Sequence, residues 1–409
     1  MMNTNKKTPK LRFKGFTDDW EQRKLGSLAT VEMNKRIFKE QTTIKGDIPF
    51  YKIGTFGSDA DSFISRELFK EYKNKYPYPN IGDILISASG SIGRTVVYNG
   101  EDAYYQDSNI VWLNHNGKID NSFLLQFYNQ VKWAGLEGST IKRLYNKNIL
   151  ETNIALPKIE EQRLIGKFFE LVDRSITLHQ RKLEKLKLNK SALLQKLFPQ
   201  KGCTIPDVRF KGFTDAWEQR KLNDFGIATG GTSIESEFVD GGTYKVINIG
   251  SYSEESVYND QGLRVNKTDK TKSRILNKYD LTMILNDKTA SGNIIGRVLL
   301  IDQDNTYVYN QRTERIEVDT KDFLPMFLYH MLNAPEQRKY IVKASQGNTQ
   351  IYVNWSTISN IDYMIPQLLL EQEKIANLFS LINKDITLHQ RKLDCLISIK
   401  KGLLQQLFV

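Results

Sequence analysis

The segment RFKGFTDDWEQRKL, at residues 12–25, indicates how the chain is organised, because it returns almost unchanged as RFKGFTDAWEQRKL at residues 209–222. The two copies differ at one position, where Ala216 stands in place of Asp19. Apart from a few short signatures, the sequence between the copies is unrelated. A repeated block that encloses divergent sequence indicates an internal duplication, with one framework and two different inserted domains.

A second repeat predicts two long helices. The segment ITLHQRKL occurs at residues 176–183 and 386–393, within a pattern of seam positions three or four residues apart. This near-heptad pattern follows Pro157 and Pro366, and it predicts a coiled-coil helix roughly 50 to 60 Å long in each half. The expected seam positions are Ile165, Phe168, Val172, Ile176, His179, Leu183, Leu186, Lys190, Leu193 and Leu197, and, 210 residues later, Ile375, Leu378, Ile382, Ile386, His389, Leu393, Leu396, Lys400, Leu403 and Leu407.

We expect the two helices to pack against each other in antiparallel orientation, because their apolar stripes need a partner and the duplication implies a pseudo-two-fold axis. The second helix then ends beside the first block, which makes Arg12 and Phe408 neighbours. His179, Lys190 and their repeats lie on the seam. Such polar residues fix the register of the helices, and the alternative interpretation is a switch or a ligand pair.

Composition limits the class of protein. The chain has 409 residues, 40% of them hydrophobic and 26% charged, which fits a soluble protein of several domains. Its formal net charge of +11 favours a polyanionic partner, with nucleic acid as the leading candidate. Two cysteines and four scattered histidines indicate neither a disulfide framework nor a metal site. The polar N-terminus and the absence of a long apolar run predict a cytoplasmic protein with no membrane span.

The sequence between the repeats predicts two mixed α/β domains. Segments such as DILISASG and LTMILND have strand patterns, whereas NSFLLQFYNQVKWAGL and FLPMFLYHMLNAPEQRKYIVKAS have helical ones. Pro325 is expected in a first helical turn, and Pro335 is expected to end or bend the pattern. The predicted organisation is the first block and variable domain at 1–155, a long helix at 156–198, a joint at 199–208, the second block and variable domain at 209–364, and a long helix at 365–409.

Two loops recur in both variable regions, at 26–155 and 223–364. SGSIGR corresponds to SGNIIGR, and GSTIKRLYNKNI corresponds to GNTQIYVNWSTI. Small and hydroxyl residues let a backbone approach a partner closely, and arginine can reach phosphate or guanine. The candidate DNA-binding residues are Ser87, Ser89, Ser91, Arg94, Gln106, Lys142, Arg143, Tyr145, Asn286, Lys288, Ser291, Asn293, Arg297, Gln311, Arg312, Gln346, Asn348, Gln350 and Tyr352. The alternative is a set of scaffold turns in which Arg94 and Arg297 form salt bridges.

Catalytic motifs are missing from the sequence. It contains no GxxxxGK[ST] phosphate loop, no GxGxxG, no GxSxG elbow and no Asn/Asp-Pro-Pro-aromatic tetrad of the kind that amino-methyltransferases use. We therefore predict no catalytic residue, no metal site and no cofactor in this chain.

The order and duplication of these segments resemble the specificity subunit of type I restriction-modification systems. The resemblance covers the whole chain and rests on the duplicated RFKGFTD-WEQRKL blocks, the helix starts LPKIEEQRLIGKFFELVD and IPQLLLEQEKIANLFSLIN, and the paired ITLHQRKL segments. It implies a non-catalytic subunit whose two target-recognition domains each read half of a bipartite double-stranded DNA sequence. It also implies that two modification subunits methylate adenine with S-adenosylmethionine, and that restriction subunits cleave with ATP and Mg²⁺.

Two features of the implied mechanism follow from the residues themselves. Two different recognition domains favour an asymmetric target, whereas identical domains about a two-fold axis would favour a palindrome. The long helices would then act as a ruler that fixes the gap between half-sites. The rival hypotheses are a non-DNA binding scaffold, with two domains on a coiled-coil spacer, and a self-contained nuclease or methyltransferase.

Overall fold

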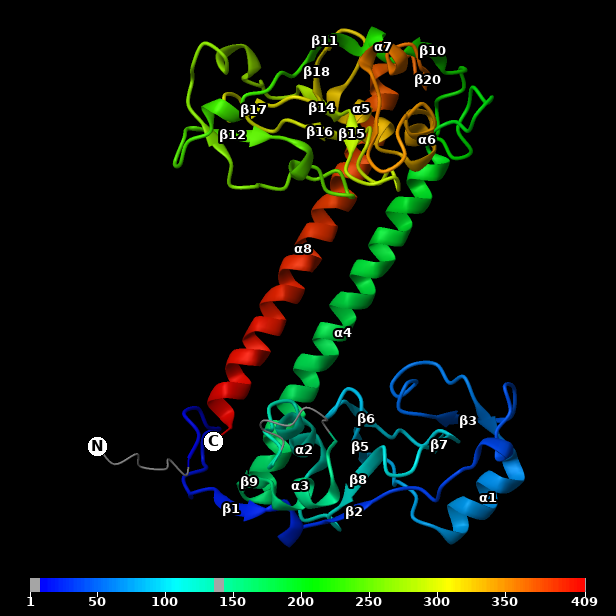
Figure 1. Cartoon of the computed structure of the whole chain (residues 1–409), viewed down its shortest axis with the longest axis vertical. Helices are drawn as coiled ribbons and strands as arrows, with labels where there is room; N and C mark the ends of the chain where they lie inside the picture. The colour runs from blue at the N-terminus through cyan, green and yellow to red at the C-terminus, as the bar shows by residue number, and fades with distance from the viewer. Residues whose placement is uncertain (1–7, 136–142, 409) are drawn as a thin grey trace. The chain divides into compact units, whose positions relative to one another are not determined.

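The structure is a computed structural model that describes residues 8–135 and 143–408, and it divides into two compact units. The first unit is Met1–Gln180 with Arg391–Val409, and the second is Arg181–Gln390. The long helices α4 (Ile159–Lys196) and α8 (Leu369–Leu407) each contribute to both units (Figure 1). Each unit is described by itself below.

The first unit combines two small sheets with short helices. A four-stranded antiparallel sheet has the order β2-β8-β5-β6, and a three-stranded sheet, β4-β3-β7, contains one parallel pair. The strand β1 pairs with β9. The elements are β1 (Glu21–Lys24), β2 (Thr30–Glu32), β3 (Ile48–Tyr51), β4 (Phe63–Ile64), α1 (Arg66–Lys75), β5 (Ile84–Ser87), β6 (Thr95–Val97), β7 (Tyr104–Tyr105), β8 (Ile110–Asn114), α2 (Asn121–Tyr128), α3 (Asn146–Glu151) and β9 (Asn153–Leu156).

The second unit repeats this plan with additions. Its four-stranded antiparallel sheet is β11-β18-β14-β16, its three-stranded sheet is β13-β12-β17, and β10 pairs with β20. A further pair, β15 with β19, joins two loops. The elements are β10 (Glu218–Lys221), β11 (Gly226–Gly230), β12 (Tyr244–Ile247), β13 (Arg264–Val265), β14 (Leu281–Ile284), β15 (Asn286–Asp287), β16 (Val298–Leu300), β17 (Tyr307–Tyr309), β18 (Thr313–Val318), α5 (Pro325–Leu332), α6 (Pro335–Lys343), β19 (Ile351–Tyr352), α7 (Trp355–Ile358) and β20 (Asp362–Ile365).

The prolines and caps set the short helices. Pro325 is the first residue of α5, as predicted, because a first turn does not need its missing N–H. Pro335 begins α6, so the predicted helical pattern divides in two there. Asp120 caps α2 by accepting from the backbone N–H of Phe123, 3.2 Å away. The helix α2 ends at Tyr128, well before the end of the helical pattern seen in the sequence.

The long helices pack along the predicted seam. In the first unit, the start of α4 lies beside the end of α8, and Ile165, Phe169 and Leu407 share one hydrophobic core (Figure 1). In the second unit, Ile375 and Leu197 belong to the corresponding core. All twenty predicted seam positions are buried or half-buried. The antiparallel packing predicted from the repeats is therefore confirmed within each unit.

The end of α8 also meets the first repeated block. The backbone N–H of Leu11 donates to the carbonyl oxygen of Gln406 over 3.0 Å, and the rings of Trp20 and Phe408 lie 6.1 Å apart. This confirms the prediction that Arg12 and the end of the second helix are neighbours. The circular repeat thus closes in the first unit.

Both repeated blocks are anchored on a helix start by a buried ion pair. Arg12 donates from Nε and Nη2 to Glu161 over 2.7 and 2.8 Å, and Arg209 forms the same bidentate pair with Glu371. Both carboxylates are almost fully buried. A buried carboxylate is strongly disfavoured without such a partner, which explains why the RFKGF block and the EEQ or LEQ helix start occur together in each half.

Candidate nucleic-acid interface

Two polar loops meet at one edge of the second unit. The strand β15 pairs with β19, so that Asn286 lies opposite Tyr352 and Asp287 lies opposite Ile351. These strands adjoin the loops 288–296 and 346–350, which lie far apart in the sequence. A backbone bridge between Gln346 and Tyr352, with N–H to oxygen distances of 2.9 and 3.0 Å, closes the second loop. The structure therefore brings together both sets of candidates predicted in this half.

The first unit has a matching arrangement. The backbone N–H of Leu144 donates to the carbonyl oxygen of Ala88 over 2.8 Å, just as Val353 donates to Leu285 in the second unit. The chain that precedes α3 thus runs beside the loop 88–94. Lys142 lies outside the described residues.

The two candidate arginines of these loops contact the framework of their own unit. Arg94 donates from Nη1 to the carbonyl oxygen of Phe56 over 2.8 Å. Arg297 donates to the carbonyl oxygen of Asn293 over 2.9 Å and to the hydroxyl of Ser256 over 3.2 Å. Burial lowers the pKa of Arg297, with nearby Glu254 partly opposing the shift. Within residues 8–135 and 143–408, neither arginine is in an ion pair.

The side chains of two candidate glutamines, Gln106 and Gln311, are held by hydrogen bonds within their own unit. Gln106 accepts at Oε1 from the N–H of Ile53 over 2.9 Å, and Gln311 donates to Glu235 over 2.9 Å. The strand registers place Tyr105 opposite Tyr51 and Tyr309 opposite Ile247. The register counterpart of Gln106 is therefore Asn310, one residue before the Gln311 that the sequence suggested. The backbone N–H of Asn310 donates to Ile247 over 2.9 Å, just as that of Gln106 donates to Tyr51, and the Asn310 side chain accepts from the N–H of Ile234 over 3.1 Å.

Arg312 and Arg143 differ in how they are held. Arg312 is exposed and has a φ of +62°, a left-handed conformation that costs a side-chain-bearing residue about 1 to 2 kcal/mol. Its guanidinium makes no hydrogen bond with any described residue. Arg143 instead donates to both the carbonyl oxygen and the hydroxyl of Ser108, each over 3.1 Å. Arg312 is thus the freer cation.

The remaining candidates divide by exposure. Ser87 is buried, and its hydroxyl donates to the carbonyl oxygen of Ser91. Ser89, Gln106, Arg143, Asn286 and Arg297 are half-buried. The exposed candidates are Ser91, Arg94, Tyr145, Lys288, Ser291, Asn293, Gln311, Arg312, Gln346, Asn348, Gln350 and Tyr352. Most of the predicted residues can therefore reach a partner molecule.

Sequence reasoning missed two buried charged residues that hold the loop 288–296. Asp287 and Arg338 are 4% and 9% exposed, and both are hydrogen-bonded to the backbone of this loop. Asp287 could have been noticed, because it is the charged last residue of the predicted strand segment LTMILND. Arg338 lies on α6, and no local sequence signal connects it with the loop.

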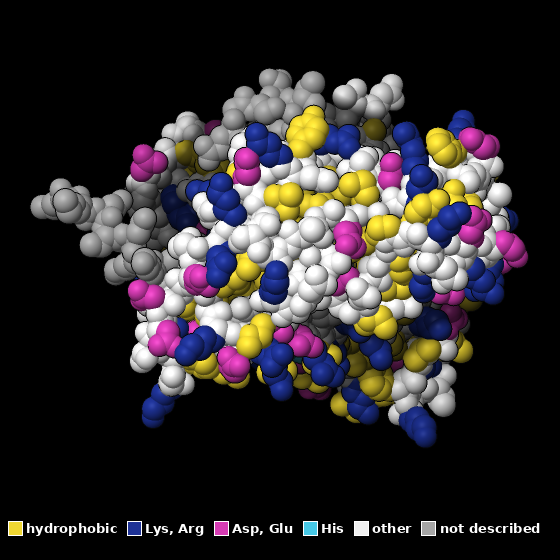
Figure 2. Space-filling view, turned by 90° about the horizontal axis from the view of Figure 1, so that it is seen from below, with side chains coloured by type: hydrophobic (Ala, Val, Ile, Leu, Met, Phe, Trp, Pro, Cys, Tyr) yellow, Lys and Arg dark blue, Asp and Glu magenta, His cyan; other side chains and the backbone are white. Residues whose placement is uncertain are grey.

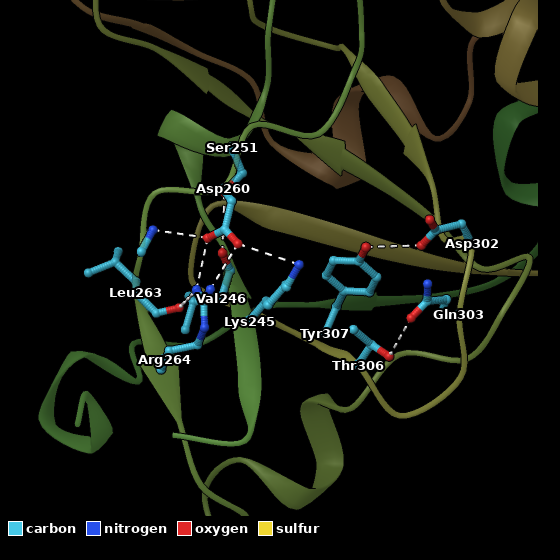
Figure 3. A network of polar contacts seen from close by, with 11 residues as sticks. Lys245, Val246, Ser251, Asp260, Leu263, Arg264, Asp302, Gln303, Thr306 and Tyr307 are labelled. Atoms are coloured by element: carbon cyan, nitrogen blue, oxygen red, sulfur yellow. Dashed lines mark hydrogen bonds and ion pairs between the residues drawn. The ribbon is translucent and has the colours of Figure 1, made fainter. Parts of the chain in front are cut away.

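Part of the positive charge is neutralised within the second unit. Arg264 forms a bidentate pair with Asp260 over 2.8 and 2.9 Å, and Lys245 lies 3.5 Å from the same carboxylate (Figure 3). The hydrogen bonds from Arg264 lower the pKa of Asp260 well below its usual range. Nearby, Tyr307 donates to Asp302 over 2.9 Å (Figure 3). These contacts lie on and beside the sheet β13-β12-β17, and they leave Lys245 and Arg264 less available to phosphate groups.

Basic side chains are distributed rather than gathered on the face that Figure 2 shows. Lysines and arginines are interleaved there with acidic and hydrophobic side chains. The aromatic residues are largely internal, because Tyr104, Tyr105 and Trp112 are buried in the first unit. Aromatic content is therefore mostly a packing feature and contributes few exposed stacking surfaces.

The seam histidines, His179 and His389, are half-buried at equivalent positions. In the first unit, the seam residue Lys400 forms an ion pair with Asp173, with an Nζ to Oδ1 distance of 2.6 Å. Among the residues that the structure describes, no three acidic, histidine or cysteine side chains gather as metal ligands. In the same residues, no helix has the length and apolar character needed to cross a bilayer.

Comparison with known proteins identifies the family. The family model described as "Type I restriction modification DNA specificity domain" matches residues 17–188 and 214–396. A putative type I restriction enzyme specificity subunit of Haemophilus influenzae, S.HindORF215P, is 54% identical over 157 residues, which are 37% of this chain and 41% of that protein. The chain therefore matches less than half of that relative's length. The MjaVIII specificity subunit of Methanocaldococcus jannaschii is 24% identical over 95% of this chain and 92% of its own.

Solved structures support the fold. The S subunit of a type I restriction-modification system from M. genitalium has a TM-score of 0.62 at 15% identity, over 98% of this chain and 99% of its own. A chain from a study of complex assembly and conformational transition of the type I R-M system has a TM-score of 0.52 at 13% identity, over 95% and 97%. Because the family model matches both halves and most of their length, this chain belongs to the family of DNA specificity subunits of type I restriction-modification systems.

Proposed function

We propose that this chain reads an asymmetric, bipartite double-stranded DNA target, with one half-site for each of the regions 26–155 and 223–364. The observation that carries the proposal is the pairing of two polar loops at one edge of the second unit, through β15 and β19, with the matching Leu144 to Ala88 hydrogen bond in the first unit. The hydrogen bond between the two segments occurs in both units, as Val353 to Leu285 and as Leu144 to Ala88, whereas the exposed side chains beside it differ. A duplicated support with divergent contacts is what two different sequence readers require.

The chemistry of the exposed loops suits base edges and phosphates. Asn348 and Gln350 carry amides that can pair with adenine, and Lys288 and Arg312 are exposed cations that can reach phosphate or guanine. The net charge of +11 adds a contribution to DNA affinity that does not depend on the DNA sequence. Because the side chains of the two recognition regions differ, the two half-sites should differ as well.

The outer faces of the long helices suit two modification subunits. Beside the buried seam, α4 exposes Leu171 and Leu178, and α8 exposes their repeats, Leu381 and Leu388. These side chains are 59%, 67%, 61% and 48% exposed, and each pair is seven residues apart, so each pair lies on one helix face. Two equivalent apolar stripes support two copies of one partner, each supplying a helix. S-adenosylmethionine, ATP and Mg²⁺ would be bound by the modification and restriction subunits.

Methylation mapping tests the whole proposal. The chain is expressed with its cognate modification subunit in cells that lack other adenine methyltransferases, and N6-methyladenine is mapped across the genome at single-base resolution. We expect one two-part motif with unequal halves and a constant gap. A palindromic motif, or a stable complex that methylates no motif, would contradict it.

A docking variant separates assembly from DNA reading. The double substitution Leu178→Asp and Leu388→Asp should remove binding of the modification subunit, because both side chains are exposed and lie outside the seam. The melting temperature of the chain alone should stay within a few degrees of the unchanged protein. Binding of the isolated chain to its target duplex should persist and fall steeply with salt, as phosphate contacts require. A weak dependence on salt would favour the non-DNA scaffold instead.

A further inference from the structure

The loop 288–296 is organised from within by a buried carboxylate. Asp287 accepts at Oδ1 from the backbone N–H of Thr289 over 3.1 Å. At Oδ2 it accepts from the N–H groups of Ile294 and Ile295 over 2.7 and 3.3 Å. Burial raises the pKa of Asp287, but these backbone donors outweigh burial and hold the pKa below its usual value. One side chain therefore fixes both the beginning and the end of the loop.

A buried guanidinium holds the same loop from the other side. Arg338, on α6, donates from Nη2 to the carbonyl oxygens of Gly292, Asn293 and Ile295 over 2.9, 3.1 and 2.8 Å. Burial lowers the pKa of Arg338 to about 10, with nearby Arg297 adding to the effect. The carboxylate thus binds the amides of the loop and the guanidinium binds its carbonyls.

These two charged side chains form hydrogen bonds with the loop and not with each other. In the described part of the chain, Asp287 and Arg338 form no ion pair, and the side chains of both are hydrogen-bonded to residues of the loop. Burying two charges is costly unless hydrogen bonds replace the lost water. The corresponding loop of the first unit is closed by a neutral group instead. There the hydroxyl of Ser87 accepts from the N–H of Arg94 over 2.9 Å.

Two glycines of the loop have left-handed backbone conformations and pack closely against side chains of α6. Gly292 has a φ of +67°, and a Cβ there would lie 3.2 Å from Val342. Gly296 has a φ of +71°, and a Cβ there would lie 2.8 Å from Ile341. While the base of the loop is fixed in this way, Lys288, Thr289, Ala290 and Ser291 remain exposed. A rigid base with an exposed polar tip is a preorganised contact surface, which loses little conformational entropy on binding.

We propose that Asp287 and Arg338 are positioning residues that hold the tip of the loop 288–296 in the shape that reads base edges in one half of the DNA target. This inference rests on the proposed function and makes it more specific. Neither residue contacts DNA; each acts through the backbone of the loop. Their loss should therefore relax sequence discrimination in one half-site and leave the other half-site unchanged.

The test uses the full complex with the modification subunit and the substitutions Asp287→Asn and Arg338→Met. Methylation is measured at genomic sites that match the motif and at sites with one mismatch in either half. We expect each variant to raise methylation at mismatched sites relative to matched sites by about tenfold, in one half only, since one mismatched base pair typically changes affinity by roughly 5- to 150-fold. A tip variant, Lys288→Ala with Ser291→Ala, should relax the same half and so identify it.

Arg315→Met is the matched control. Arg315 forms a bidentate pair with the buried Asp280 over 2.8 and 3.2 Å in the same unit, away from the loop. This variant should lower the melting temperature and the overall rate but keep the wild-type motif. If it relaxes the same half, or if the loop variants relax both halves, the effect is general destabilisation and the inference is wrong.

The outcomes also separate this inference from the proposed function. If the unchanged complex methylates no bipartite motif, the proposed function fails and the inference fails with it. If the unchanged complex methylates such a motif and both loop variants keep full discrimination, only the positioning role is refuted. Asp287→Asn is the milder change, because it preserves the size of the side chain. If Arg338→Met does not fold, Asp287→Asn alone tests the positioning role.

Discussion

Replacing Glu314 by glutamine should flatten the pH dependence of stability in the second unit. Glu314 lies on β18, opposite Met283 of β14 and Gly230 of β11, and it is 5% exposed. Among the described residues its carboxyl group has no hydrogen-bond or ion-pair partner. Burial raises the pKa of Glu314 to about 7, although nearby Arg274 opposes the shift. At the equivalent register position, the first unit has the apolar Val111.

The sign and size of the effect follow from this shift. The folded state binds the proton more tightly than the unfolded state, so the contribution to stability is fully present below the ordinary pKa of 4.5 and is lost as pH rises through about 7. At about 1.4 kcal/mol for each pH unit, the total loss is about 3.4 kcal/mol. About 2.5 kcal/mol of this loss falls between pH 5 and pH 8.5. Glutamine stays neutral and avoids it.

Urea denaturation at pH 5 and pH 8.5 measures the effect. Pulsed hydrogen exchange of peptides that contain β18 assigns the transition to the second unit. Relative to the unchanged chain, Glu314→Gln should gain about 2.5 kcal/mol between the two pH values. Glu317→Gln, on the same strand but with a carboxylate that is 57% exposed, is the control and should follow the unchanged chain. Parallel profiles for Glu314→Gln and the unchanged chain would refute the reasoning.

Three further predictions test the framework. Arg209→Met leaves the carboxylate of Glu371 buried without its ion-pair partner, which should lower the free energy of unfolding by about 3 to 5 kcal/mol, measured by calorimetry. The double variant with Glu371→Leu should recover most of that loss. Asp173→Asn removes the partly exposed ion pair with Lys400 and should cost no more than about 1 kcal/mol by thermal denaturation, a difference that should shrink in 1 M salt. Inserting four residues into both α4 and α8 should lengthen the gap in the methylated motif by about two base pairs, since the helix rise adds roughly 6 Å; an unchanged gap would contradict the ruler hypothesis.

The long helices were predictable because a seam is a local pattern. Leu183 and Leu393 occupy matching seam positions, and both are 7% exposed. A periodicity of three and four residues identifies such positions without knowledge of the rest of the fold. The same periodicity does not reveal that Leu171 and Leu178 stay exposed, because their spacing of seven is compatible with either face. Which leucines face the partner helix is decided by packing between distant segments.

The candidate site was predictable only in its exposed part. Loops rich in glycine and polar residues mark positions such as Ser291 and Gln350, which the structure finds exposed. The supporting residues lie elsewhere in the chain: Arg338 reaches Gly292 across 46 positions of sequence. No local pattern encodes that contact, because it depends on how α6 packs beneath the loop. Likewise, the strand registers show that the counterpart of Gln106 is Asn310. Matching short motifs by eye pointed instead to the next residue, Gln311, because the two variable regions differ in length.

The two halves of the seam have diverged where they contact the variable regions. In the first unit, Asp173 pairs with Lys400 and also accepts from Gln126 of α2 over 3.4 Å. The 210-residue repeat puts Asn383 at the position of Asp173, and the alignment of α2 with α5 puts His330 at the position of Gln126.

These exchanges give each unit its own electrostatics. Burial lowers the pKa of His330 to about 3, with Lys190 adding to the shift, so that this imidazole is neutral. A chimaera that joined α5 to the first half of the seam would place His330 beside Asp173, and a carboxylate raises the pKa of a neighbouring imidazole. As pH falls below 6.5, the ordinary pKa of histidine, such a chimaera should therefore lose less stability through His330 than the parent does. The seam is thus matched to the domain it carries, and a recognition region should transfer between halves only together with its own seam residue.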